Sequence, residues 1–204
     1  MTKYLFVILI AYLMGSSSMS FYLMKWKNME LRNKGSKNLG ASNAMMVMGW
    51  RYGILVAIHD IGKAAVAVLL AQHFFPELPY IGFAAGVAAV LGHIFPFYLK
   101  FKGGKGFASY IGMSLALNWK FTLIILVLVV IVTLVTDYIV VGTTLTVVSV
   151  PIYYAVTTLN WIIPAILCIA TFVIMYKHRM NFVRIAKGTE IGLRSANRGE
   201  HRAK

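Results

Sequence analysis

LKFKGGKGFASYIG, residues Leu99 to Gly112, places lysines and glycines directly before a hydrophobic segment. Lysine is costly in hydrocarbon and glycine weakens a helix, so this stretch is unusual at a point where a helix enters a membrane. The G-x-x-x-x-G-K-[ST] spacing of a Walker A loop is missing. Two interpretations are open: a helix entrance built to hold an anion, or an ordinary basic loop at a membrane surface.

The composition of the whole chain is that of an integral membrane protein. Of its 204 residues, 59% are hydrophobic and 13% are charged, whereas a soluble domain averages about half and about a quarter. Apolar segments cover approximately residues 4–24, 53–75, 81–99, 107–117, 121–135, 139–157 and 161–176. At roughly 20 residues per crossing, they predict an all-α polytopic membrane helix bundle of about seven transmembrane helices, forming a single domain over residues 1–204.

The distribution of positive charge predicts the orientation of this bundle. The net charge is +14, and all but three of the 20 lysines and arginines lie in residues 25–52, 99–106 and 177–204. Cytoplasmic loops carry such an excess, so we expect all three regions on the cytoplasmic side. Seven crossings then place the N-terminus outside and the C-terminus in the cytoplasm. The charge needs no nucleic-acid partner.

The first basic region contains KGSKNLGASN, Lys34 to Asn43. Its glycines permit tight turns, and its serines and asparagines supply neutral hydrogen-bonding groups. Such a loop can wrap a phosphate with backbone N–H groups and side-chain donors. The alternative is a flexible, solvated loop. The candidate phosphate-binding residues are Ser36, Asn38, Gly40, Ser42 and Asn43.

The second basic region is the opening stretch itself. Its glycines let the backbone approach a ligand closely, and Phe107 begins a helix whose N-terminus faces the loop. Exposed N–H groups and the helix dipole favour an anion there, with Lys105 as the charged partner. Without further context, a positive-inside loop is the simpler interpretation. The other candidate phosphate-binding residues are Lys102, Gly103, Gly104 and Gly106.

The third region is YKHRMNFVRIAKGTE, Tyr176 to Glu190, in the motif-bearing segment 177–192. His178 and Asn181 are expected just past the last helix, near the membrane surface. His178 is a candidate base or anion ligand. The alternative is a basic amphipathic tail that binds anionic lipid.

Charged groups within the apolar segments are a separate signal. Asp60 and Lys63 are three residues apart, so they share a helical face and are predicted to form a structural ion pair in the membrane. His59 and His93 are interpreted as buried histidines rather than catalysts. Metal-ligand spacing is missing, and the one cysteine, Cys168, excludes a cysteine-based cluster, so we expect no cofactor.

Together, these stretches resemble the bacterial integral-membrane acyl-phosphate:glycerol-3-phosphate acyltransferases. GSKNLGASN is similar to that family's G-S-x-N-x-G-A-T-N loop, and KHRMNFVRIAKGTE is similar to its R-H-x-x-N-x-x-R-x-x-x-G-T-E ending. LGHIFPFYLKFKGGKGFAS matches G-H-x-F-P-x-x-x-x-F-K-G-G-K-G-x-A-T nearly residue for residue, and DIGK resembles D-x-x-K. The similarity covers most of the chain. The family has seven helices with its conserved loops on the cytoplasmic side, as the charge predicts here.

The resemblance implies transfer of a fatty acyl group from acyl phosphate to the sn-1 hydroxyl of glycerol 3-phosphate. The product is lysophosphatidate for phospholipid synthesis, made at the cytoplasmic face of the bacterial plasma membrane. Membrane lipids are the other implied partner. Acyl phosphate is already activated, so positioning and charge neutralisation suffice without a strong protein base. The residues implied to be catalytic are Lys105, His178 and Asn181.

Two positions depart from the family pattern. Met46 stands where the family has an active-site arginine, and Arg51, five residues on, is the nearest replacement and a further candidate substrate-binding residue. Val140 stands where the family has a functional serine. The alternative prediction is therefore a degenerate paralogue that binds phosphorylated lipid, or regulates lipid synthesis, without normal turnover. A small-anion transporter fits less well, because no polar pathway follows the helices.

Overall fold

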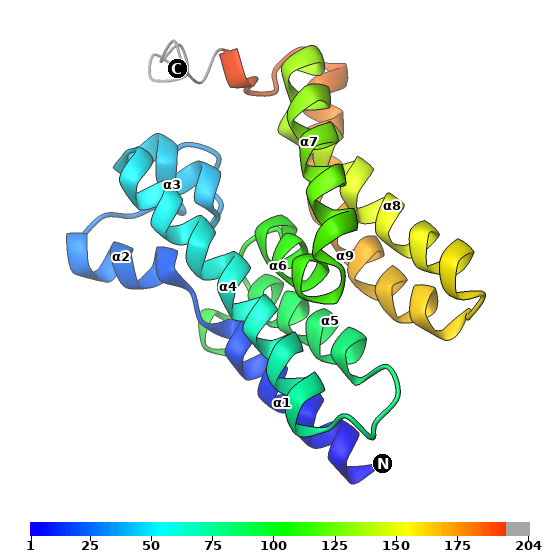
Figure 1. Cartoon of the computed structure of the whole chain (residues 1–204). Helices are drawn as coiled ribbons and strands as arrows, with labels where there is room; N and C mark the ends of the chain where they lie inside the picture. Colours follow the sequence, from blue (N-terminus) through cyan, green and yellow to red (C-terminus); the bar gives the residue numbers. More distant parts are fainter. Residues whose placement is uncertain (195–204) are drawn as a thin grey trace. The chain divides into compact units, whose positions relative to one another are not determined.

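The computed structural model describes residues 1–194, and this part of the chain is helical without any strand (Figure 1). The short 3-10 helix η1 covers Phe97–Leu99. The α-helices are α1 (Thr2–Ser16), α2 (Met19–Lys27), α3 (Ala41–Met48), α4 (Trp50–Phe74), α5 (Ile81–Ile94), α6 (Phe107–Leu117), α7 (Trp119–Thr136), α8 (Ile139–Thr158) and α9 (Ile162–Ala186). The predicted all-α class is confirmed. Arg198, Arg202 and Lys204 of the third basic region lie outside the described residues.

Within residues 1–194, six helical stretches are long and apolar enough to cross a membrane. They are Thr2–Lys27, Trp50–Phe74, Ile81–Leu99, Trp119–Thr136, Ile139–Thr158 and Ile162–Ala186. The 11-residue α6 is a shorter apolar helix, too short for an average bilayer. The protein is therefore a polytopic integral membrane protein, and the seven predicted apolar segments all form helices.

The first apolar segment forms two helices where the sequence predicts one. α1 ends at Ser16 and α2 begins at Met19, and the two helices diverge in Figure 1. Serine is a weak helix former in a helix interior but a strong N-cap, because its side chain bonds to nearby backbone groups. Here the Ser18 hydroxyl accepts a hydrogen bond from the Phe21 N–H at 3.4 Å. The serine run after Gly15 therefore breaks the helix and starts a new one.

The last helix is longer than the sequence predicts. The hydrophobic pattern ends near residue 176, but α9 continues to Ala186 and stops before Gly188, which adopts a positive φ of 66°. Polar and basic residues of good helix propensity carry the helix past the apolar stretch. His178 and Asn181 therefore lie on a helix, three residues apart on one face, and the expectation that they follow the last helix is wrong.

The chain divides into two compact units, Met1–Trp119 and Lys120–Lys204, so the single-domain organisation stays a prediction. In unit 1, α4 lies at the centre and packs against α1, α2, α3, α5 and α6. Small residues dominate the contacts among α1, α4 and α5, as is common where membrane helices approach closely. In unit 2, α8 packs against α9, and the Thr171 hydroxyl donates to the Val147 carbonyl oxygen across this contact at 2.8 Å.

The N-terminal end of α1 lies beside the connection between α4 and α5. Lys3 pairs with Glu77 at 2.7 Å, and the Tyr4 hydroxyl donates to the Pro79 carbonyl oxygen at 2.8 Å. At the opposite end of α1, the Tyr98 hydroxyl donates to the Ser16 carbonyl oxygen at 2.9 Å. Within unit 1, the N-terminus and residues 75–80 therefore lie at one end. The segment that leads into residues 100–106, the lysine–glycine loop, lies at the other end.

Candidate functional site

The segment from Pro96 to Gly106 folds back on the end of α5. The Gly103 N–H donates to the Ile94 carbonyl oxygen at 3.1 Å, and the Gly104 N–H donates to the His93 carbonyl oxygen at 3.2 Å. These bonds satisfy carbonyl groups that the end of a helix leaves without partners. Gly106 is the N-cap of α6 and adopts a φ of 96°, a backbone conformation that residues with a side chain rarely adopt. The loop is thus a folded turn that leads directly into a helix N-terminus.

The first turn of α6 has the properties of an anion site. The N-cap Gly106 offers no side-chain cap, so backbone N–H groups at this end are left for another acceptor. Ser109 is fully buried, and its hydroxyl has no hydrogen-bond partner among the described residues. Lys105 is half-buried directly before this turn, whereas Lys102 is exposed. A bound phosphate would supply an acceptor for the N–H groups at the start of α6 and for the Ser109 hydroxyl.

The first motif loop is folded around one buried side chain. Asn43 is 1% exposed, its Oδ1 atom accepts from the Ser36 N–H at 2.7 Å, and its Nδ2 atom donates to the carbonyl oxygens of Leu31 and Asn38, both at 2.9 Å. Asn43 therefore organises this loop. Ser36 and Ser42 are exposed, Asn38 and Gly40 are half-buried, and Gly40 is the N-cap of α3. The loop offers its hydroxyl groups at the surface while its backbone is held from within.

Arg32 joins the two motif loops of unit 1, and sequence reasoning did not single it out. Its Nη2 atom donates to the Lys102 carbonyl oxygen at 3.3 Å, and its Nε atom is buried without a hydrogen-bond partner among the described residues. A guanidinium group with an unsatisfied N–H beside a glycine loop is suited to bind a phosphate oxygen. The available signal was its place four residues before Ser36, within the first basic region.

The two departures from the family pattern lie in regular helices. Met46 is half-buried on α3, and Val140 is 1% exposed in the first turn of α8. Arg51 lies in the first turn of α4, is exposed, and places its guanidinium carbon 5.6 Å from the centre of the Trp50 ring. A charged replacement for Met46 by Arg51 stays a prediction.

In unit 2, α9 presents the two candidate residues of the third motif. His178 is 6% exposed, and its Nδ1 atom donates to the Ile174 carbonyl oxygen at 2.9 Å, because a carbonyl oxygen can only accept. In the neutral ring, Nε2 is then the acceptor nitrogen. Asn181 is 7% exposed, and its Nδ2 atom donates to Glu190 Oε1 at 2.5 Å. This bond fixes the orientation of the Asn181 amide.

Glu190 is a second residue that the candidate set lacked. Its other carboxylate oxygen accepts from Arg184 Nε at 2.6 Å, so one carboxylate holds two side chains of α9. The turn that brings it back is closed by the Thr189 N–H, which donates to the Arg184 carbonyl oxygen at 2.8 Å. The signal was present in the G-T-E ending, but its partners are set by the extension of α9.

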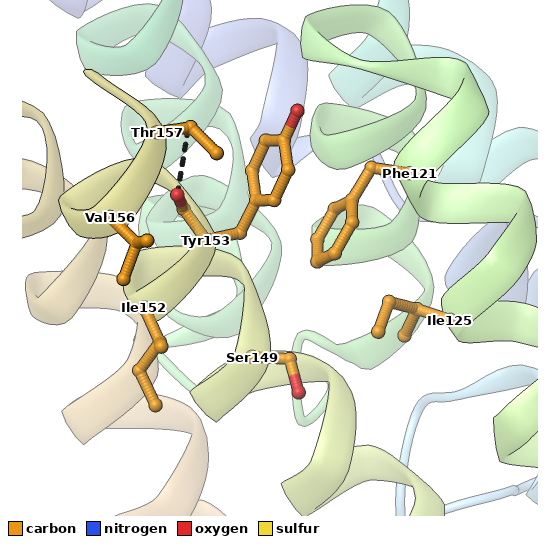
Figure 2. Close-up of a pocket in the computed structure, with 7 residues that line it drawn as sticks. All are labelled: Phe121, Ile125, Ser149, Ile152, Tyr153, Val156 and Thr157. Carbon is orange, nitrogen blue, oxygen red and sulfur yellow. Dashed lines mark hydrogen bonds between the residues drawn. The ribbon is translucent and has the colours of Figure 1, made fainter.

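Unit 2 also has an apolar groove between α7 and α8 of about 310 Å³ (Figure 2). Phe121 and Tyr153 stack across it with ring centres 4.0 Å apart, and the Thr157 hydroxyl donates to the Tyr153 carbonyl oxygen at 2.7 Å. None of the candidate residues lines this groove. Clusters of three or more histidine, cysteine or acidic residues that could hold a metal ion are absent from the described residues.

Comparisons with known proteins agree on one family. Residues 5–188 match the family model described as glycerol-3-phosphate acyltransferase. A glycerol-3-phosphate acyltransferase of Prochlorococcus marinus (strain MIT 9312) is 35% identical over 187 residues, which cover 90% of this chain and 94% of the relative. Two crystal structures of PlsY (YgiH), an integral membrane glycerol 3-phosphate acyltransferase, are also similar.

The first of these structures, the glycerol 3-phosphate form, has a TM-score of 0.87 and 30% identity, covering 94% of this chain and 96% of that one. The second, the lysophosphatidic acid form, has a TM-score of 0.85 and 28% identity, covering 95% and 96%. The likeness therefore extends over nearly the whole chain in both sequence and structure.

Proposed function

We propose, from the premise that this chain belongs to the glycerol-3-phosphate acyltransferase family, that it takes its acyl group from an acyl phosphate and transfers it to the sn-1 hydroxyl of glycerol 3-phosphate. The products are lysophosphatidate and inorganic phosphate. The reaction takes place at the cytoplasmic face of the bacterial plasma membrane. Both substrates carry a phosphate group, and the donor and product also carry a long acyl chain, which suits an enzyme embedded in the bilayer.

The observation that carries this proposal is the N-terminus of α6. The Gly103–Gly106 turn, the uncapped N–H groups and the buried, unpartnered Ser109 hydroxyl together form a site of the right chemistry for a phosphate. Lys105 directly precedes them and neutralises the charge of the bound group. Arg32 approaches the same loop through the Lys102 carbonyl oxygen.

The chemistry requires positioning more than proton abstraction. The sn-1 oxygen of glycerol 3-phosphate attacks the acyl carbon, the new ester C–O bond forms, and the bond between the acyl carbon and the phosphate oxygen breaks. The departing phosphate accepts the hydroxyl proton, so charge neutralisation by Lys105 assists departure. His178, with an acceptor nitrogen at Nε2, and Asn181, held by Glu190, position the glycerol 3-phosphate.

The decisive experiment follows acyl transfer by the purified protein in lipid nanodiscs. With palmitoyl phosphate and glycerol 3-phosphate, we expect inorganic phosphate and 1-acyl lysophosphatidate in equal amounts. Palmitoyl-CoA at the same concentration serves as the matched donor control and should give no product. Turnover with the CoA ester, or acylation at the sn-2 hydroxyl, would overturn the donor or the regiochemistry.

The buried Val140 and the uncharged Met46 favour one second candidate, a paralogue that binds phosphorylated lipid without normal turnover. That candidate predicts lysophosphatidate binding to the wild-type protein in the absence of product formation. Met46→Arg combined with Val140→Ser should then restore turnover, because the first change adds a phosphate partner and the second adds a hydroxyl. Ready turnover by the wild-type protein excludes it.

A further inference from the structure

A buried cluster of charged and polar side chains lies inside unit 1, where α4 meets α5. Asp60 and Lys63 of α4 are 2% and 9% exposed, and Lys63 Nζ lies 2.9 Å from Asp60 Oδ1, which confirms the predicted ion pair. His93 of α5 is 6% exposed, and its Nδ1 atom lies 2.9 Å from Lys63 Nζ and 3.3 Å from Asp60 Oδ1. Charged groups inside membrane helices are expensive, so this cluster points to a role beyond packing.

The shorter of two contacts at His93 Nδ1 favours one tautomer of the ring. Lys63, 2.9 Å from a carboxylate, is an ammonium group, which donates hydrogen bonds and cannot accept them. Lys63 Nζ is the nearer of the two groups that face His93 Nδ1, at 2.9 Å against 3.3 Å for Asp60 Oδ1, and with this ammonium as the donor Nδ1 is the acceptor of a neutral ring. The ring proton consequently lies on Nε2, the nitrogen on the side of the ring remote from the ion pair.

The Nε2 side of the ring meets the loop that leads into α6. A Cβ atom added to Gly104 would overlap His93 Nε2, and one added to Gly103 would overlap the His93 carbonyl oxygen. The same carbonyl oxygen accepts from the Gly104 N–H at 3.2 Å. The imidazole thus fills the space that a side chain at position 104 would take. The ring therefore packs directly against the backbone of the loop at Gly104.

The same cluster also contacts Ser17, at the break between α1 and α2. Lys63 Nζ donates to the Ser17 carbonyl oxygen at 2.6 Å, so the ammonium group is fixed by a carboxylate, an imidazole and a backbone carbonyl. His59 lies next to the same group of atoms, 3.0 Å from the Ser17 hydroxyl and 3.5 Å from Asp60 Oδ1. Since His59 touches the same carboxylate, it offers a matched control for His93.

We propose that Asp60, Lys63 and His93 are positioning residues for a phosphate group bound at Gly103–Gly106. Asp60 compensates the charge of Lys63, Lys63 holds the His93 ring in its Nε2-protonated form, and the ring supports the backbone of Gly104. The N–H groups at the start of α6 are thereby fixed for the ligand. This inference rests on the proposed function, because the ligand is the phosphate of acyl phosphate or of glycerol 3-phosphate.

The first test compares His93→Gln with His59→Gln in steady-state acyl transfer. We expect His93→Gln to raise the KM of the substrate whose phosphate occupies the loop by about tenfold or more, with a smaller change in kcat. Varying acyl phosphate and glycerol 3-phosphate separately identifies that substrate. His59→Gln should leave both KM values within about twofold. Equal KM values in His93→Gln and wild type would overturn the inference.

The second test is a double-mutant cycle between the ring and the loop. Gly104→Ala alone should weaken inhibition by inorganic phosphate, because its Cβ atom displaces the loop from His93 Nε2. Combined with His93→Ala, which removes the ring, Gly104→Ala should cause little further loss. Fully additive effects would mean that the ring does not set the position of the loop, and would overturn the inference.

The third test measures the protonation of the His93 ring in the wild-type protein, so it does not require a variant to fold. Imidazole ¹⁵N NMR of histidine-labelled protein should show a neutral His93 protonated at Nε2. A proton on Nδ1 would overturn the inference.

The inference and the proposed function fail separately. A wild-type protein without acyl transfer, whose binding of inorganic phosphate still weakens in His93→Gln, overturns the proposed function and supports the positioning role. An active wild-type protein whose His93→Gln variant is unaffected supports the proposed function and overturns the positioning role.

Discussion

Lys105 directly precedes the α6 N-terminus and is the residue through which the proposed phosphate site is most simply tested. Lys105→Ala removes a charge-assisted contact worth about 1.5–3 kcal/mol, so we expect substrate affinity to fall roughly 10- to 150-fold. Lys100→Ala is the matched control, because Lys100 is an exposed lysine of the same loop. The measurement is the KM for each substrate. Small and equal effects of the two changes would favour an ordinary basic loop.

Arg51 is the predicted replacement for a charge at position 46, and the structure adds Arg32 as a second candidate. If Arg51 supplies it, Arg51→Ala should abolish turnover. The geometry favours Arg32, because its guanidinium contacts the Lys102 carbonyl oxygen and its Nε has no partner within residues 1–194, whereas Arg51 lies exposed over Trp50. We therefore expect Arg32→Ala to reduce kcat/KM by roughly 10- to 150-fold, more than Arg51→Ala does.

Met46→Arg completes this comparison. It should raise activity or leave it intact, because it adds a cation where the resembling family has one. Wild-type turnover in Arg32→Ala would contradict the assignment of Arg32, and wild-type turnover in both alanine variants would show that neither arginine replaces the missing charge.

At the scale of elements, the contact between α4 and α6 includes one close backbone approach at a glycine. A Cβ atom on Gly112 of α6 would overlap the Ile61 carbonyl oxygen of α4, whereas one on Gly62 would meet no atom within 4 Å. Gly112→Ala should therefore lower the unfolding temperature, since overpacking typically costs about 1–3 kcal/mol. Gly62→Ala should leave it unchanged or raise it, because alanine is favoured over glycine in helices by about 1 kcal/mol.

Thermal unfolding in detergent measures both variants of this pair. An unfolding temperature of Gly112→Ala at or above that of Gly62→Ala would contradict close packing of α6 on α4. Because α6 carries the candidate anion site at its N-terminus, Gly112→Ala should also raise the KM for substrate.

At the scale of the whole molecule, the distribution of lysine and arginine predicts an N-terminus outside and a C-terminus in the cytoplasm. Single cysteines are placed at Thr2 or at Ala203, which lies outside the described residues, in a protein whose Cys168 is replaced by serine. In intact cells the cysteine at position 2 should be labelled, and the one at position 203 should be labelled only once the membrane is opened. An impermeant maleimide is the appropriate reagent. Labelling of both positions from one side would contradict an odd number of crossings.

Within unit 1, the structure is compatible with this topology. Lys3 pairs with Glu77, while the break after Ser16 contacts Tyr98 near the lysine–glycine loop. The N-terminus therefore lies at the end of unit 1 remote from that loop. The side of the membrane to which each end belongs is what the labelling experiment measures.

Most of the helices and the loop at 99–106 were predictable from the sequence because their signals are local. The regions 25–52 and 177–192, predicted as loops, instead contain α3 and the end of α9. The length of an apolar run shows whether it can span a bilayer, and a lysine–glycine stretch before such a run indicates a loop. Residue-by-residue resemblance to family motifs then predicted Lys105, His178 and Asn181 as catalytic residues. The ends of α1 and α9 were less predictable, since serine capping and helix propensity override hydropathy there.

Only the tertiary structure decided which of these groups touch. Arg32 and the Lys102 carbonyl oxygen are 70 positions apart, and Lys63 and His93 are 30 apart, so no local pattern pairs them. The sequence by itself determined a membrane helix bundle, and its basic, glycine-containing loops predict phosphate binding. Helix packing determined that a buried ion pair and an imidazole lie directly behind one of those loops, because contacts between distant residues depend on how the helices approach and not on the order of residues within them.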